Sequence, residues 1–247
     1  MMPEILCLTG CDEAFGALSD ISLRSLRHYC QRHGFRLTFQ PLESSGRPIS
    51  WSKIPLIQEA FRQGAEFVWW VDVDVVVVDP SRSIRDVIEP GKDLYLVKHD
   101  DGRRTNPNGG VMLLRNSPWT VDLLERLWDL DVYTDHKWWE TAAIIHLLSP
   151  ESFADSGIPD ARDRIPDGPV KWLGLEWNSI PYVEGGRFAC PDPVLNHYAS
   201  LPLKYRLASM RQDYWRSPAG LEEKADMPTR LQTWRWLRPS RIRRLLG

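Results

Sequence analysis

The sequence predicts an α/β fold in which a single Rossmann-like, mostly parallel sheet carries helices on both faces. Short apolar runs alternate with segments of helical periodicity, an order of elements typical of such sheets. The chain has 247 residues, of which 43% are hydrophobic, and can therefore bury one substantial core. We expect one domain over residues 1–215 and a basic C-terminal tail over residues 216–247.

The first part of the chain alternates regularly between strands and helices. Helix ends are marked by Ser19 as a capping residue and by Gly34 and Gly64 as terminators. The predicted elements are a strand at Glu4–Thr9, a helix from Ser19 to Gly34, a strand at Arg36–Gln40, a helix at Trp51–Gln63 and a strand through the apolar run at 67–80.

The second part continues the pattern and then becomes irregular. Pro118 opens a helix, as proline often does in a first turn. Residues 149–168 lack periodicity and predict a long loop. The predicted elements are a short helix at Ser83–Ile88, strands at Leu94–Lys98 and Gly110–Arg115, helices at Pro118–Leu130 and Trp138–Leu148, and short strands and loops from Lys171 to Tyr198.

Composition excludes several classes of function. The formal net charge of −2 gives no basic field for nucleic acid, and no apolar run is long enough to cross a bilayer. No basic segment with an apolar signal core opens the chain, so we expect a cytoplasmic protein. The four cysteines have neither zinc-site nor disulfide-scaffold spacing. Residues 230–247 are rich in Arg, Trp and Leu, which fits either a solvated helix or peripheral contact with anionic lipid.

Two carboxylates, Asp72 and Asp74, interrupt the apolar run FVWWVDVDVVVVDP at 67–80. A buried carboxylate costs several kcal/mol unless a cation or hydrogen-bond donors offset it. Residues two apart in a strand point to the same side. The pair therefore predicts half of a site for Mg²⁺ or Mn²⁺, with an exposed pair on an edge strand as the alternative.

Five segments together carry a resemblance to a known family. The sequence resembles glycosyltransferase family 34, the galactosyl/mannosyl/xylosyl transferase group, and the order and gaps of the segments are similar. The segments are WSKIPLIQEAF (51–61), FVWWVDVDVVVVDP (67–80), NGGVMLLRNSPWTVDLLERLW (108–128), WWETAAIIHLL (138–148) and NHY (196–198).

The resemblance implies a GT-A fold and a metal-dependent, retaining transfer of a sugar from a nucleotide-diphosphate sugar to a hydroxyl. A UDP-sugar is favoured as donor and a GDP-sugar stays open, while the acceptor is a carbohydrate or a lipid-linked glycan. Mn²⁺ or Mg²⁺ is the implied cation, with Asp72, Asp74 and His197 as its ligands. No nucleic-acid partner is expected.

Further residues are assigned to the donor and to catalysis. Glu140 and Asp101 are the candidate catalytic carboxylates, and Arg206 is a weaker candidate for phosphate contact. The candidate contacts to the nucleotide sugar are Thr9, Lys53, Asp72, Asn108, Gly109, Gly110 and Lys204. The chain departs from the family at Thr141 and Ala142, which replace a Gln and an Asp, so that Glu140, Asp100 or Asp101 must take the missing part.

Alternatives remain for the function and for single residues. A nucleotidyltransferase acting on sugar phosphates needs a basic Gly-rich loop after the first strand, and TGCDEAFG has no Lys or Arg. An inactive sugar-nucleotide-binding domain stays open because of Ala142. His197 can be a hydrogen-bonded structural residue, Lys53 an exposed helix residue, and Glu140 a first-turn acid favourable to the helix dipole.

Overall fold

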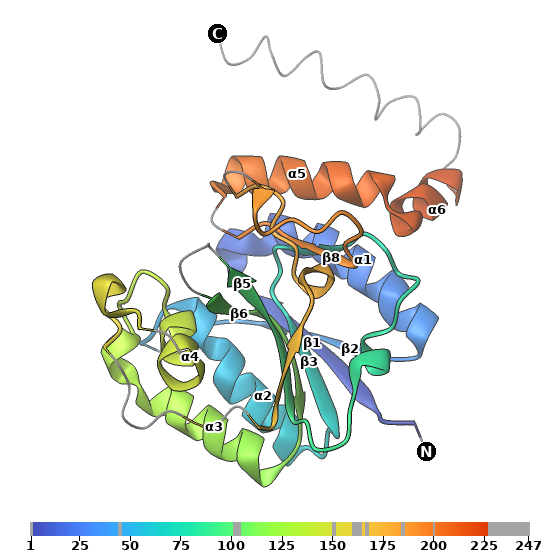
Figure 1. The fold of residues 1–247 in the computed structure, drawn as a ribbon. Coiled ribbons are helices and arrows are strands. Elements are labelled where there is room, and N and C mark those ends of the chain that lie inside the picture. The colour runs from blue at the N-terminus through green and yellow to red at the C-terminus, as the bar shows by residue number, and fades with distance from the viewer. Residues whose placement is uncertain are drawn as a thin grey trace, which may run out of the picture.

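A six-stranded sheet in the order β2-β1-β3-β6-β5-β7 forms the centre of the protein (Figure 1). The computed structural model describes residues 2–43, 46–100, 105–149, 152–159, 165, 168–183, 186–199 and 201–226. The strands are β1 (Ile5–Cys11), β2 (Arg36–Pro41), β3 (Phe67–Val71), β4 (Val75–Val77), β5 (Leu94–Asp100), β6 (Thr105–Arg115), β7 (Val170–Leu173) and β8 (Leu195–His197). The α-helices are α1 (Gly16–His33), α2 (Lys53–Arg62), α3 (Pro118–Asp129), α4 (Glu140–Leu148), α5 (Leu203–Arg216) and α6 (Pro218–Asp226).

The central sheet is mostly parallel, as predicted. β1 pairs in parallel with β2 and β3, and β5 pairs in parallel with β7. β6 lies antiparallel between β3 and β5, so it is the one strand of this sheet that runs against the others. The sheet therefore has one parallel group, β2, β1 and β3, whose strands end at the same side of the sheet. The reversed strand β6 joins this group to the second parallel pair, β5 and β7.

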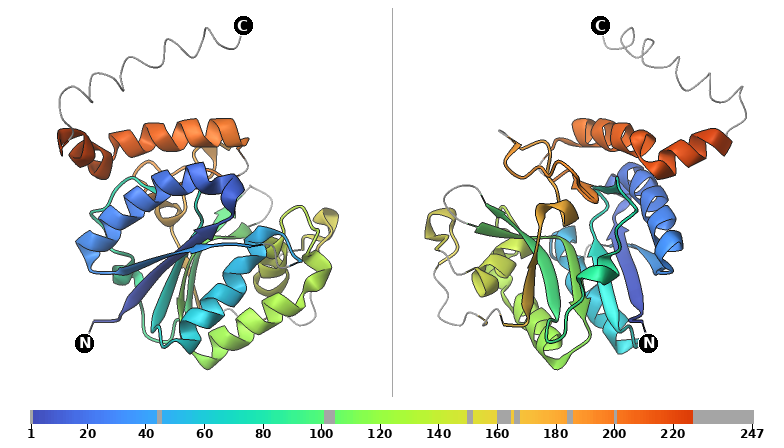
Figure 2. Two further views of the ribbon diagram at one scale, coloured as in Figure 1. Left: turned by 180° about the vertical axis from the view of Figure 1, so that it is seen from behind. Right: turned by 45° about the vertical axis from the view of Figure 1, so that its right-hand side comes forward.

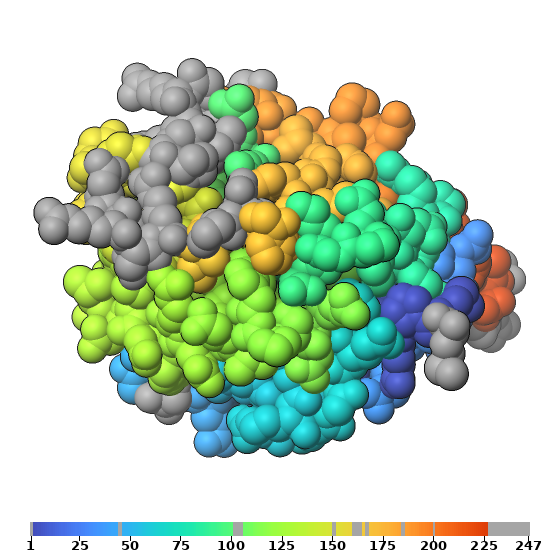
Figure 3. All heavy atoms as spheres, turned by 60° about the horizontal axis from the view of Figure 1, so that its bottom comes forward, coloured from blue at the N-terminus to red at the C-terminus, as the bar shows by residue number. Residues whose placement is uncertain are grey.

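Helices cover both faces of the sheet, which confirms the predicted α/β architecture. Side chains of β1 and β3 alternate between two apolar clusters, with Leu6 and Val68 in one and Cys7 and Trp69 in the other. The first cluster includes α2, α3 and α4, and the second includes α1 (Figure 2). Seen from below, atoms of α2 and α3 lie side by side over the first cluster (Figure 3).

The acidic strand predicted over residues 67–80 is broken in the structure. β3 ends at Val71, a turn contains Asp72 and Asp74, and β4 leaves the main sheet to pair antiparallel with β8. The Asp72 amide donates to Gly110 O at 2.8 Å, which keeps the first residue of the turn attached to β6. The prediction of one continuous strand was wrong because carboxylates cannot be accommodated between two apolar clusters.

Two other element ends differ from their predictions. α1 begins at Gly16, and Ser19 lies inside it, where its hydroxyl donates to Gly16 O instead of capping the helix. α1 ends at Gly34 as predicted, with a left-handed backbone at φ 67°. β6 begins at Thr105, so the Asn108–Gly110 segment belongs to a strand and not to the turn before one.

The small sheet formed by β4 and β8 lies between the central sheet and α5 (Figure 1). α6 falls in the segment predicted as a tail, and it packs on α1, where Arg24 pairs with Glu223 at 2.6 Å. The predicted lipid-contacting stretch 230–247 is outside the described residues. Among the described helices, none has both the length and the apolar character required to cross a membrane.

Candidate functional site

Asp72, Asp74 and His197 come together where β3, β4 and β8 meet. The turn between β3 and β4 supplies the two carboxylates, and the last residue of β8 supplies the imidazole. One ligand atom from each of the three lies within 4.8 Å of the others. Asp74 and His197 are buried, and Asp72 is partly exposed. The three residues predicted as metal ligands can therefore contact a single cation.

A chain of side-chain amides fixes the orientation of His197. The Gly110 amide donates to Asn108 Oδ1 at 2.9 Å, which also accepts from Asn178 Nδ2 at 2.9 Å. The side-chain oxygen of Asn178, Oδ1, lies 2.8 Å from His197 Nδ1 and accepts a hydrogen bond from it. His197 Nε2 is left with its lone pair toward the carboxylates, the tautomer that a metal ligand requires.

Asp74 is held between His197 and Arg206. Its Oδ1 lies 3.3 Å from His197 Nε2, and its Oδ2 lies 3.0 Å from a guanidinium nitrogen of Arg206. Burial by itself raises the pKa of Asp74, but His197 and Arg206 outweigh this effect and hold the pKa below its usual value. Asp74 is therefore ionised at neutral pH, which is the form that binds a cation.

Lys53 lies buried at the centre of a second charged group. Its Nζ is 3.1 Å from Asp72 Oδ1, 2.7 Å from Glu140 Oε1 and 3.1 Å from Gly109 O. Burial alone lowers the pKa of Lys53, yet the two carboxylates raise it above its ordinary value. Trp70 Nε1 also donates to Asp72 Oδ1 at 2.6 Å. Lys53 thus links the metal-side carboxylate to the carboxylate that begins α4.

A cavity of about 380 Å³ opens beside these two charged groups. Glu140 is 4% exposed, and its Oε2 has no hydrogen-bond partner among the described residues. Asn106 Oδ1, on another wall of the cavity, also lacks one. Buried acceptors without partners are costly in an empty site and are satisfied when a ligand supplies hydroxyl or amide donors.

Glycines in β6 make room for the ligand residues. A Cβ at Gly110 would lie 2.3 Å from His197 Cε1, and a Cβ at Gly109 would lie 2.6 Å from Ile144 Cδ1. The two glycines therefore have different neighbours. Gly110 allows the imidazole to pass over β6, whereas Gly109 allows α4 to pack against the strand.

Among the assigned residues that the structure describes, Thr9, Gly109 and Lys204 do not line the cavity. Thr9 is fully buried within β1, and its neighbours Gly10 and Cys11 line the cavity instead. Lys204 is exposed on α5, while Arg206, two residues later, reaches Asp74. Asp101 lies outside the described residues.

The departures from the family at 141 and 142 fall in different places. Thr141 lines the cavity, whereas Ala142 is fully buried in the apolar cluster between α4 and the sheet. A side chain at position 142 therefore faces the core in this fold. The loss of an acid there does not remove a group from the cavity.

Sequence reasoning did not identify Asn178 or His99 as site residues. The side chain of Asn178 sets the tautomer of His197. The backbone carbonyl oxygen of Asn178 accepts a hydrogen bond from His99 Nε2 at 2.7 Å. Burial lowers the pKa of His99 to about 4, so this imidazole is neutral. No local pattern marks these residues, because their partners are 19 and 79 positions away in the chain.

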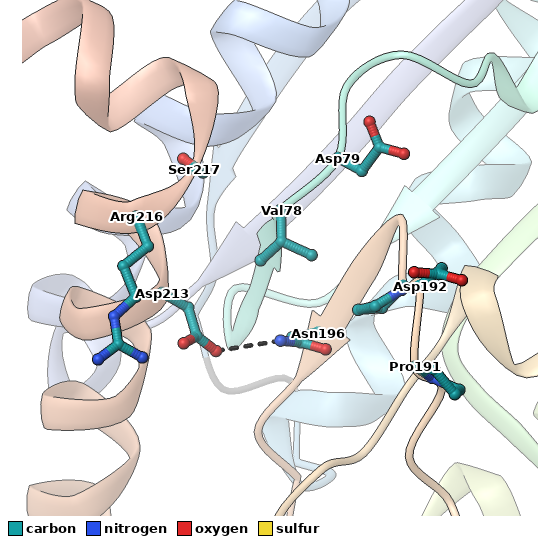
Figure 4. A pocket seen from close by; sticks show the side chains of 9 residues that line it. Val78, Asp79, Pro191, Asp192, Asn196, Asp213, Arg216 and Ser217 are labelled. Carbon is teal, nitrogen blue, oxygen red and sulfur yellow. Dashed lines mark hydrogen bonds between the residues drawn. The ribbon is translucent and has the colours of Figure 1, made fainter.

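Behind His197, an acid on α5 anchors the two residues on either side of it in the chain, Asn196 of β8 and Tyr198 just after β8. Asp213 Oδ2 accepts from Asn196 Nδ2 at 3.0 Å and from the Tyr198 hydroxyl at 2.6 Å. Figure 4 shows Asp213 pointing from α5 toward Asn196, and both residues line a hollow of about 440 Å³. Burial and the Asp213 carboxylate raise the pKa of Tyr198, which keeps its hydroxyl protonated as a donor. This hollow lies on the far side of β8 from the cation site.

A protein-family model and curated relatives match this chain. Residues 2–101 match the model of the galactosyl transferase GMA12/MNN10 family. The probable alpha-1,6-mannosyltransferase MNN10 of Saccharomyces cerevisiae is 26% identical over 160 residues, which cover 50% of this chain and 40% of the yeast protein. Xyloglucan 6-xylosyltransferase 1 of Arabidopsis thaliana is 30% identical over 141 residues, 50% of this chain and 30% of the plant protein. The chain thus spans less than half of either relative.

Solved structures show the fold over most of the chain. A glycosyltransferase involved in glycosylation of the major capsid of PBCV-1 has a TM-score of 0.62 at 17% identity, covering 85% of this chain and 100% of that one. The galactosyltransferase LgtC, in complex with donor and acceptor sugar analogues, has a TM-score of 0.56 at 9% identity, covering 92% and 99%. These likenesses confirm the expected GT-A fold.

Proposed function

We propose that this chain, whose residues 2–101 match the model of the galactosyl transferase GMA12/MNN10 family, is a metal-dependent glycosyltransferase. The donor is a nucleotide-diphosphate sugar, with UDP favoured over GDP as the nucleotide. The acceptor is a hydroxyl of a carbohydrate or of a lipid-linked glycan. Relatives named as mannosyl- and xylosyltransferases support transfer of a hexose or a pentose.

The observation that carries this proposal is the convergence of Asp72, Asp74 and His197. In the neutral imidazole whose Nδ1 proton is donated to Asn178, the Nε2 lone pair lies 3.3 Å from Asp74 Oδ1, so these two acceptors repel each other unless a cation or a proton lies between them. Two carboxylates and an imidazole suit Mn²⁺, and Mg²⁺ is the alternative. Bound there, the cation would neutralise charge on the diphosphate as the sugar leaves.

The charged residues around the cation site have complementary roles. Arg206 is directed at the same carboxylate as His197, so it can also contact a diphosphate placed against Asp74. Lys53 holds Glu140 through Oε1 and leaves Oε2 available to accept from a sugar hydroxyl. For a retaining transfer, the departing phosphate can take the proton of the acceptor hydroxyl, so no separate carboxylate base is required.

Thermal unfolding with a panel of sugar nucleotides tests this function. We expect UDP-sugars, or GDP-sugars in the alternative, to raise the melting temperature in the presence of Mn²⁺ and much less without it, because a ligand of the native state stabilises it by mass action. Release of nucleoside diphosphate in the presence of glycan acceptors then measures turnover.

Asp74→Ala should abolish the metal-dependent shift, and Asp79→Ala is the matched control. Asp79 lies beyond β4 at the other hollow and does not line the cavity. No shift with any nucleotide, or an equal shift in Asp74→Ala, would overturn the proposal. A metal-dependent shift without release of nucleotide would instead favour a sugar-nucleotide-binding domain without turnover.

A further inference from the structure

Trp139 has an unusual backbone conformation at the entrance to α4. Its φ of 46° and ψ of −129° make it the single non-glycine residue with positive φ in the described part of the chain. A bulky residue in this region is strained, and such strain persists where the surrounding structure enforces it. The Trp139 amide donates to His136 O at 2.8 Å, and its carbonyl accepts from Ala142 N at 3.0 Å. Hydrogen bonds to both its amide and its carbonyl therefore hold Trp139 in this backbone conformation.

The conformation separates two consecutive tryptophans. Trp138 packs against the apolar cluster beneath α4, with its ring 6.2 Å from that of Phe153. Both tryptophans line the cavity, but Trp139 is the exposed one, with 48% of its surface accessible. A large apolar ring left in water gains nothing from folding. The exposure of the Trp139 ring therefore has no compensation in the folded chain.

The groups beside Trp139 indicate the chemistry of a matching ligand. The next residue, Glu140, has a buried oxygen without a partner, and Asn106 has a second one in the same cavity. A ligand that satisfies them needs several hydroxyl donors, and one that covers an indole needs an apolar face. A pyranose ring has both, because its axial C–H groups form a face and its hydroxyls project from the rim.

We infer that Trp139 is a binding platform for a sugar ring, with the adjacent Glu140 accepting from a hydroxyl of that ring. This inference rests on the proposed function, since it concerns the same cavity. The ring can belong to the donor or to the acceptor, and the two sources share this chemistry. A nucleobase would also stack on an indole, but it would not supply several hydroxyls.

Trp139→Gly and Trp139→Phe test the platform. Glycine adopts this backbone region without strain, so we expect Trp139→Gly to melt at the wild-type temperature or above while its sugar binding weakens by about threefold to tenfold. Trp139→Phe should restore most of the binding. Tyr205→Ala is the control, because Tyr205 is a 61% exposed aromatic residue that does not line the cavity.

Three affinities separate the outcomes. A weaker affinity for the sugar nucleotide with unchanged affinity for the free nucleoside diphosphate assigns the platform to the donor sugar. A raised acceptor KM with unchanged hydrolysis of the donor assigns it to the acceptor sugar. Unchanged values throughout, a weaker affinity for the free nucleoside diphosphate, or a lower melting temperature of Trp139→Gly would overturn the inference.

Failure of the proposed function gives a different result. Wild-type protein that binds no nucleotide sugar contradicts the function. The platform is then tested directly by quenching of tryptophan fluorescence with methyl glycosides. If methyl glycosides quench the fluorescence of the wild type but not that of Trp139→Gly, the platform is supported. Equal quenching in the two proteins refutes it.

Discussion

Adjacent glycines in β6 have separate tasks although the sequence presents them as one motif. Gly110 donates its amide to Asn108 and leaves room for the His197 ring. Gly109 accepts from Lys53 through its carbonyl and leaves room for Ile144 of α4. The difference follows from strand alternation, since neighbouring residues face opposite sides of the sheet. One glycine therefore serves the cation site and the other serves the core.

Alanine substitutions should separate these two tasks. In Gly110→Ala the methyl group would meet the imidazole at 2.3 Å, and we expect Mn²⁺ affinity to fall by about tenfold or more because His197 is displaced. In Gly109→Ala the methyl group meets Ile144, so we expect stability to fall by about 1–3 kcal/mol through overpacking. Titration calorimetry and denaturant unfolding measure the two effects. Equal metal affinity in wild type and Gly110→Ala would contradict the assignment.

At the scale of elements, α5 acts on the site from both of its ends. Arg206 near its start pairs with Asp74, and Asp213, seven residues later on the same helical face, holds Asn196 and Tyr198. Asn196 and Tyr198 flank His197, the last residue of β8. The Tyr198 amide also donates to Asp74 O at 2.9 Å, which ties β8 to the acidic turn. The helix therefore fixes the relative positions of residues that come from three separate elements.

Asp213→Ala tests this positioning role. Loss of the carboxylate leaves two donors unpaired, so we expect a stability loss of about 1–3 kcal/mol and weaker Mn²⁺ binding, although Asp213 is not a ligand. Gln212→Ala, at an exposed position of the same helix, is the control. Reduced stability with unchanged metal affinity would show that Asp213 contributes to stability but does not position the metal ligands.

At the scale of the whole molecule, the cavity lies where the central sheet, the β4–β8 sheet and α5 meet. Several buried ionisable residues line it, namely Lys53, Asp74, His99, Glu140 and His197. His99 is buried as a neutral imidazole with a pKa of about 4, and Asp74 is buried as a carboxylate with a lowered pKa. Global stability is therefore coupled to the ionisation of these two residues.

Unfolding measured against pH tests this coupling. An unfolded histidine titrates near pH 6.5, so between about pH 6.5 and 4 the unfolded chain binds a proton that folded His99 does not. Stability should fall through this window by on the order of 3 kcal/mol, and the lowered pKa of Asp74 adds to the loss at more acidic pH. His99→Gln should flatten the dependence between pH 6.5 and 4. The same slope in both proteins would contradict this origin.

The sequence determined the features of this protein that depend on near neighbours in the chain. Apolar periodicity located α2, α3, β1, β2 and β5 to within a few residues, and the acids at 72 and 74 were conspicuous because an apolar run surrounds them. These signals arise from residues two to four apart. Such spacings are set by the geometry of a strand or a helix.

The tertiary structure decided which residues meet at the cavity. Whether Arg206 or Lys204 reaches Asp74, whether Thr141 or Ala142 faces the cavity, and how Asn178 orients His197 all depend on the packing of separate elements. The end of β3 was decided in the same way, because a carboxylate leaves an apolar sheet at the point where partners from other strands can offset its charge. Those partners are distant in the sequence, so no local pattern specifies them.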